Sequence, residues 1–132
     1  MERIAHALFG SRYSIHDLSR CTGQGSANLA RFNMPLELGM AIAHQFLSAP
    51  GDKHSWLVLV PAGDGHSRFI SDLAAYDLSR HDGSIEGVVS AVIKWLVTKP
   101  EAIPTMKPAI VLEHLPVFEV SLRELRTERG RQ

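Results

Sequence analysis

The chain has 132 residues, of which 45% are hydrophobic and 21% are charged, and its 14 Lys and Arg balance its 14 Asp and Glu. This length and apolar content suffice for one hydrophobic core, which excludes an intrinsically disordered protein. The balanced charge argues against a nucleic-acid-binding protein, which usually presents a uniformly basic surface.

The sequence also lacks membrane and secretory signals. No apolar run approaches the roughly 18 residues of a membrane span, and the first residues, Met-Glu-Arg-Ile-Ala-His, have neither the basic nor the apolar region of a signal peptide. Cys21 is the only cysteine, so no intrachain disulfide can form. We therefore expect a cytoplasmic protein that has neither a membrane nor a nucleic acid as its partner.

The first predicted elements are a short helix and a strand. Apolar residues at positions 4, 5, 8 and 9 share one helical face, which Gly10 closes. Residues 12–16 alternate polar and apolar side chains, which indicates a strand. A segment rich in Ser, Thr, Gly and Asn then runs from Asp17 to Asn33, and loops of this length are usually functional or mobile.

A second helix and a buried strand follow. Asn33 and Pro35 are typical of a helix start, with Pro35 at the first helical position. Met34, Leu38, Ile42 and Phe46 recur every four residues and predict one buried stripe. The run Ser55-Trp-Leu-Val-Leu-Val60 is typical of a strand buried on both faces in a parallel sheet.

The last third of the chain favours helices. A short helix is predicted over 67–74, and a longer one begins after the capping residue Ser84 and ends near Leu96. Residues 109–115 fit a strand or a helix, with the helix preferred. After Pro116, residues 117–129 predict a separate amphipathic helix. We expect one α/β domain over 1–132, with a core over 1–99 and a helical extension over 100–132.

The order of these elements is a βαβ pattern, which predicts a parallel sheet flanked by helices. Only two strands stand out, and two parallel strands do not make a stable sheet. Three explanations remain: a weak segment supplies another strand, a second copy or a partner domain completes the sheet, or the chain begins partway into a larger fold.

Glu37 is the main candidate for chemistry. It follows a strand and a loop at the start of a helix, and ligands of open parallel sheets bind where loops lead into helix N-termini. Gly39 lies two residues on and would let a ligand or a strand come close. The alternative is structural, because an acid in the first helical turn gains about 0.3–1 kcal/mol from the helix dipole and can close a capping box.

Asp17 ends the first strand and is expected to face the same crevice as Glu37. Two carboxylates there could serve a sugar, one binding the ribose hydroxyls and the other stabilising a cationic anomeric carbon. Asp17 also fits ordinary turn chemistry. His16 is more typical of a structural histidine than of a base. Arg31, with other arginines near the crevice, is interpreted either as a phosphate ligand or as solvated surface.

Other kinds of site are rejected on spacing. The seven histidines show no metal-ligand spacing, so no metal site is expected. The glycine pairs at 23 and 25 and at 63 and 65 match neither a Walker loop nor a Rossmann fingerprint. Ser19 and Cys21 have no triad-like arrangement that the sequence supports.

Two motifs carry a resemblance to a family. Residues 11–20, Ser-Arg-Tyr-Ser-Ile-His-Asp-Leu-Ser-Arg, and residues 31–39, Arg-Phe-Asn-Met-Pro-Leu-Glu-Leu-Gly, resemble a family of mostly uncharacterised bacterial proteins with the pattern "RYxIHDxSR … RFNMPxELG". Members also share an apolar strand and a Phe-Ile-Ser-Asp segment, here 69–72. The resemblance covers roughly residues 3–96. Family members usually begin with a further strand, helix and strand, so this chain looks truncated at its N-terminus.

That family is similar to TIR-like and nucleoside 2-deoxyribosyltransferase-like domains, which implies a flavodoxin-like fold. The resemblance places Glu37 as the catalytic group at the anomeric carbon of an N-glycoside. It places Asp17, Ser19 and Asn33 at the ribose or base, and it implies no cofactor beyond NAD or a nucleoside as substrate.

Three hypotheses follow. The chain is an N-glycoside hydrolase or transferase, a nucleotide-sensing or TIR-like interaction module without turnover, or a remnant whose pocket is lost. The expected partners are a small-molecule nucleotide and a second copy or a partner domain, giving a homo-oligomer or a completed sheet.

Overall fold

The computed structural model describes residues 2–19, 33–49, 54–63, 76, 78–100 and 106–130. The chain divides into two compact units, Met1–Gly83 and Ser84–Gln132, and each is described by itself. The division falls at the start of the third helix, whereas the sequence placed the beginning of the helical extension at residue 100. The predicted helix over 67–74 lies outside the described residues.

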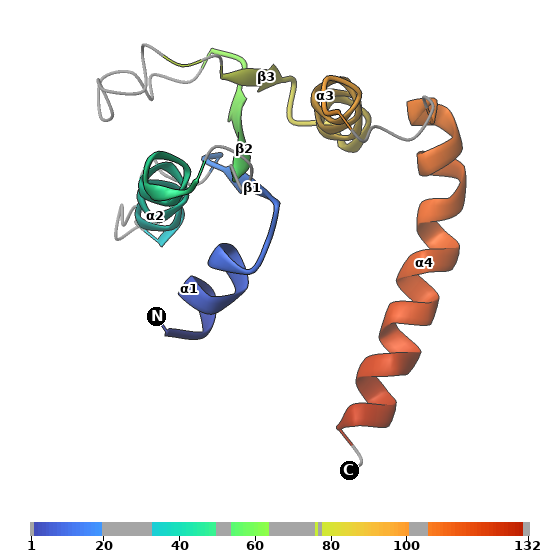
Figure 1. Ribbon diagram of the computed structural model, residues 1–132. Helices are drawn as coiled ribbons and strands as arrows, with labels where there is room; N and C mark the ends of the chain where they lie inside the picture. Colours follow the sequence, from blue (N-terminus) through green and yellow to red (C-terminus); the bar gives the residue numbers. More distant parts are fainter. Residues whose placement is uncertain are drawn as a thin grey trace, which may run out of the picture. The chain divides into compact units, whose positions relative to one another are not determined.

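The first unit contains a parallel three-stranded sheet in the order β1-β2-β3 (Figure 1). The strands are β1 (Tyr13–Asp17), β2 (Ser55–Pro61) and β3 (Ser79–His81). The α/β class and the first two strands are confirmed. The third strand comes from a weak segment, one of the three explanations left open. Its polar string Ser-Arg-His carries no apolar alternation, so the pattern could not reveal it.

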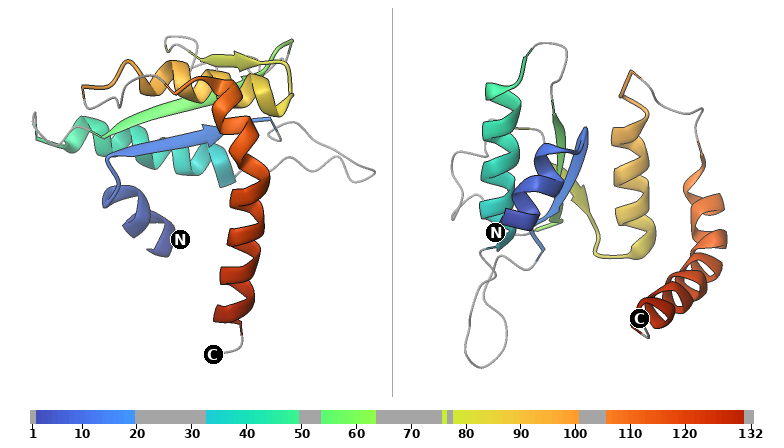
Figure 2. Two further views of the ribbon diagram at one scale, coloured as in Figure 1. Left: turned by 90° about the vertical axis from the view of Figure 1, so that its right-hand side faces the viewer. Right: turned by 60° about the horizontal axis from the view of Figure 1, so that its bottom comes forward.

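Two helices accompany this sheet. α2 (Asn33–Leu47) packs on β1 and β2, and α1 (Glu2–Phe9) packs on α2; both views of Figure 2 show α2 running beside β1 and β2. The core between α2 and the sheet consists of buried apolar side chains: Leu18, Leu38, Val58 and Val60. On the other face of β2, Leu57 and Leu59 are also buried, which confirms a strand covered on both sides.

The predicted stripe of α2 is correct over its first three members. Leu38 is buried, and Met34 and Ile42 pack against the core. Phe46 is 71% exposed, so its place in the stripe was wrong. It lies in the last turn of α2, and a period of four drifts away from the 3.6-residue turn as a helix lengthens.

The start of α2 also differs from the expectation. The helix begins at Asn33, two residues before Pro35, and its first turn contains no acidic residue. Glu37 therefore lies in the second turn. A capping box and the strongest part of the helix dipole, which acts within the first turn, do not explain its position.

The second unit consists of two helices that pack on each other, α3 (Ile85–Leu96) and α4 (Pro108–Arg129). Ser84 caps α3 as predicted, since its hydroxyl accepts from the backbone N–H of Gly87 at 2.9 Å. The predicted break at Pro116 is wrong, because α4 continues through it. A proline removes one N–H donor, and the turns on either side keep their own bonds. Among the helices described, none has the length and apolarity that crossing a bilayer requires.

Candidate functional site

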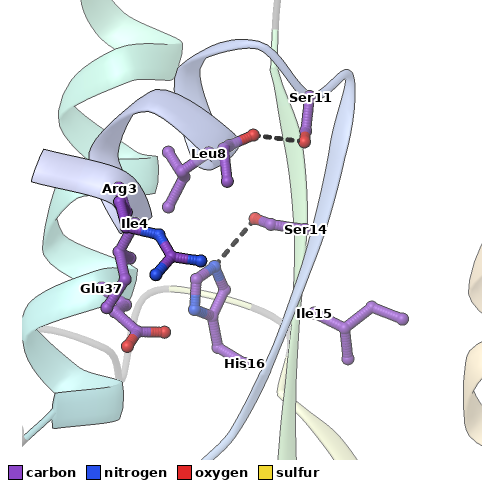
Figure 3. A pocket seen from close by; sticks show the side chains of 9 residues that line it. Arg3, Ile4, Leu8, Ser11, Ser14, Ile15, His16 and Glu37 are labelled. Atoms are coloured by element: carbon purple, nitrogen blue, oxygen red, sulfur yellow. Dashed lines mark hydrogen bonds between the residues drawn. The ribbon is translucent and has the colours of Figure 1, made fainter. Parts of the chain in front are cut away.

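The first unit has a hollow of about 630 Å³ between α1, β1 and the first half of α2. Its polar lining comes from all three elements: Arg3, Ser11, Ser14, His16 and Glu37. Figure 3 shows Arg3, His16 and Glu37 on the same side of β1. Apolar side chains of α1, including Ile4 and Leu8, form one wall.

Glu37 is the acidic member of this lining. It is half-buried, and within the described part of the chain it forms neither a hydrogen bond nor an ion pair within 4.0 Å. In Figure 3 the guanidinium of Arg3 lies on the same side of β1 as the Glu37 carboxylate and the His16 ring. A carboxylate, an arginine and an imidazole therefore face a shared space, where they can bind a polar ligand that carries both donors and acceptors.

His16 is a buried polar group of the site. Its side chain is 3% exposed, and its Nε2 lies 2.8 Å from Ser14 Oγ. Burial, and secondly the neighbouring His54, lower the pKa of His16 to about 4. His16 Nδ1 is buried and has no hydrogen-bond partner among the described residues. A buried nitrogen without a partner is rare in proteins, and it costs free energy unless something else satisfies it.

Ser14 links His16 to a second buried histidine. Ser14 Oγ lies 2.7 Å from His54 Nε2, and His54 Nδ1 lies 2.7 Å from the backbone oxygen of Ser11. The centroid of the His44 ring, on α2, lies 5.4 Å from that of His54, and the two rings are tilted by 48°. The interpretation of His16 as a hydrogen-bonded structural histidine thus holds for its Nε2 and not for its Nδ1.

Asp17 does not line the hollow with Glu37. Successive residues of a strand point to opposite faces, so Asp17 and its neighbour His16 diverge. The Asp17 carboxylate accepts from the backbone N–H of Ser19 at 2.9 Å and from the Ser19 hydroxyl. Ser19 Oγ also lies 3.4 Å from His81 Nε2. The alternative role of Asp17 in a turn is therefore confirmed. The carboxylates of Asp17 and Glu37 do not converge over this hollow.

The remaining candidates are at its edge or outside it. Asn33 is exposed in the first turn of α2, and Gly39 is exposed in the same helix. A Cβ built on Gly39 would meet nothing within 4 Å, so no described strand approaches it closely. Arg31 lies outside the described residues.

Three residues of the site were not anticipated: Arg3, Ser14 and His54. Ser14 could have been found from the alternation of β1, which places it on the same face as His16. The pairing of Tyr13 with Ser55 sets His54 beside the start of β1, and no local pattern indicates this pairing. Arg3 enters the site through the packing of α1 on α2.

The part of the chain that the structure describes holds no group of three or more His, Cys, Asp or Glu side chains able to hold a metal ion. No family model, no curated protein and no solved structure matches the chain. The chemistry of the hollow itself therefore carries the functional argument.

Proposed function

We propose that the first unit binds a nucleoside or a nucleotide such as NAD in this hollow and cleaves or transfers its N-glycosidic bond. The observation that carries the proposal is that Glu37, without a partner among the described residues, lines a hollow of about 630 Å³ together with His16 and Arg3. Small-molecule sites usually measure about 300–1,000 Å³. A flavodoxin-like, TIR-like arrangement and a cytoplasmic location belong to the same proposal.

The chemistry needs a carboxylate close to the sugar. Cleavage of an N-glycosidic bond builds positive charge on the anomeric carbon and the ring oxygen, and a nearby carboxylate stabilises that charge. Glu37 supplies the negative charge. Arg3 lines the same hollow and supplies donors for a phosphate.

One observation favours a second candidate function. Sugar-cleaving enzymes usually use two carboxylates, whereas Glu37 is the one acidic residue among the described lining of the hollow. A module that binds the nucleotide without turnover, or that reports it to a partner, needs only the ligand contacts. Such a module predicts ligand-induced stabilisation without product.

The deciding experiment follows the release of free base or nicotinamide by chromatography from NAD and a panel of nucleosides. Replacing Glu37→Gln keeps the size of the side chain and removes its charge, so kcat is expected to fall about 10²–10³-fold. The matched control is Asp17→Asn. It removes the carboxylate of a β1 residue that is next to His16 in sequence but does not line the hollow, and it is expected to retain activity.

Equal rates for the wild type and Glu37→Gln would end the enzymatic proposal. If neither protein releases product, thermal unfolding with saturating nucleotide distinguishes the sensing module. Ligand at about 100 times its Kd stabilises a protein by about 2.7 kcal/mol, and Glu37→Gln is expected to reduce the shift in Tm. An unchanged Tm with every nucleotide would exclude this second function too.

A further inference from the structure

Three hydrogen bonds connect the backbone oxygen of Ser11, His54, Ser14 and His16, and His16 lines the hollow. The donor of each bond follows from the bond at Ser11. His54 Nδ1 lies 2.7 Å from the backbone oxygen of Ser11, which can only accept, so Nδ1 carries the hydrogen. The other nitrogen of a neutral imidazole is an acceptor. Ser14 therefore donates its single O–H hydrogen to His54 Nε2 across 2.7 Å.

The state of His16 follows from the same reasoning. Because the Ser14 hydroxyl has already donated, its oxygen accepts from His16, whose Nε2 lies 2.8 Å away. The hydrogen of neutral His16 is then on Nε2, and Nδ1 holds a free lone pair. This is the nitrogen that is buried without a partner among the described residues. In Figure 3 the ring edge away from Ser14 faces Glu37.

We infer that His16 is the proton acceptor of the hollow, and that Ser14 and His54 are positioning residues that move the accepted proton away from it. This inference deepens the proposed function and rests on it. When water adds to the anomeric carbon of NAD, a C–O bond forms, the C–N bond breaks, and nicotinamide leaves with the electron pair. The water loses one proton to His16 Nδ1.

The proton then moves by exchange along the chain. The hydrogen of His16 Nε2 passes to Ser14 Oγ, and the hydrogen of Ser14 passes to His54 Nε2. The result is a neutral His16, whose hydrogen is now on Nδ1, and a protonated His54. When His16 Nδ1 gives that hydrogen to water in the hollow, the proton of His54 returns through Ser14 to His16 Nε2, and the starting tautomers are restored. In the meantime His54, and not His16, carries the positive charge.

Hydrogen bonding explains why the charge rests on His54. A protonated His54 has an acceptor for each N–H, the Ser11 carbonyl and the Ser14 oxygen. A protonated His16 would leave its Nδ1–H without an acceptor among the residues that now contact it. The other titratable groups that face the chain are Arg3 of α1, and Glu37 and His44 of α2. The lowered pKa of His16, about 4, agrees with a ring that stays neutral.

The first test reads the ring nitrogens directly, in the wild-type protein, by ¹⁵N NMR of the histidine side chains. At neutral pH, His16 is expected as the Nε2–H tautomer and His54 as the Nδ1–H tautomer. An Nδ1–H tautomer of His16, or an Nε2–H tautomer of His54, at neutral pH would overturn the inference.

The second test follows nicotinamide release in three variants. Ser14→Ala breaks the chain and is expected to lower kcat about tenfold or more and to change the pH profile, since positioned acid–base groups contribute about 10²–10⁴-fold. Ser14→Thr keeps the hydroxyl and is expected to restore both. His6→Gln changes an exposed histidine that lies 3.9 Å from Glu2, so it controls for the loss of a polar side chain and is expected to leave both unchanged.

The two tests separate the inference from the proposed function. Wild-type rate and pH profile in Ser14→Ala overturn the proton relay even if Glu37→Gln is inactive. If the wild type releases no base from any substrate, the proposed function fails, while the NMR spectrum still decides whether His16 and His54 have the tautomers that the inferred chain requires.

Discussion

At the residue scale, two neighbouring side chains on β1 have opposite fates. His16 points into the core beside α2 and is 3% exposed, whereas Asp17 points the other way and binds the backbone of Ser19. The alternation of a strand accounts for this difference of about 180° between adjacent side chains. The buried imidazole therefore belongs to the candidate site, and the carboxylate belongs to a turn.

Burial of His16 makes stability depend on pH. Its pKa is about 4 in the folded chain and about 6.5 when unfolded. As pH falls, the unfolded chain therefore takes up this proton before the folded chain does. The contribution of neutral His16 to the free energy of unfolding is complete above pH 6.5 and is lost as pH falls toward 4. The free energy of unfolding is expected to drop by about 2 kcal/mol from this group between pH 7 and pH 5.

Urea unfolding at pH 7 and pH 5 measures that drop, with His16→Gln as the comparison. Glutamine does not titrate, so the stability gap between the two proteins is expected to narrow by about 2 kcal/mol toward pH 5. A gap that stays constant over this range would show that His16 takes up its proton equally in both states.

At the scale of elements, α2 connects the fold to the site. Leu38 and Ala41 anchor one face of the helix in the core, and this fixes the side on which Glu37 meets the hollow. Gly39 is exposed in the middle of the same helix, where a Cβ would meet nothing within 4 Å. Glycine in a helix interior is about 0.5–1 kcal/mol less favourable than alanine.

Replacing Gly39→Ala is therefore expected to raise the free energy of unfolding by about 0.5–1 kcal/mol, measured by urea or thermal unfolding. Ligand binding tests whether Gly39 lets a ligand come close, as its position two residues after Glu37 suggested. If Gly39 gives close access to a nucleotide, the same variant binds the nucleotide more weakly. If affinity is unchanged, Gly39 is no part of the binding site. A loss of stability would contradict the open space around this residue.

At the scale of the whole molecule, α4 exposes large apolar side chains. Among those that follow Pro116, Val117, Phe118, Val120 and Leu125 are 52–66% exposed. Apolar area of this kind commonly marks an interface. The homo-oligomer predicted from the sequence remains a prediction, and α4 is the surface of the described chain that best suits it.

Light scattering after size exclusion tests this expectation. The wild-type protein is expected to show a mass above the 14.6 kDa of one chain, and Phe118→Asp is expected to shift it toward the monomer. Glu119→Lys, a change of an exposed charged neighbour, is the control. A wild-type mass of one chain at every concentration would contradict self-association.

The sequence by itself determined the elements whose signal is local. The apolar run of β2, the core face of α2 and the cap at Ser84 each depend on residues a few positions apart, and the structure confirms them. The sequence also predicted that Glu37 lies near the start of a helix that follows a strand. Errors occurred where a local rule was applied too strictly, as at Phe46, at Pro116 and at the first turn of α2.

Tertiary structure decided what Glu37 faces. Ser14 and His54 are 40 residues apart, and only the parallel pairing of β1 with β2 brings them within hydrogen-bond distance. Arg3 reaches the hollow because α1 packs on α2, and β3 is recognisable as a strand only from its pairing with β2. Such contacts arise from register and packing between distant segments, which no short pattern of residues encodes.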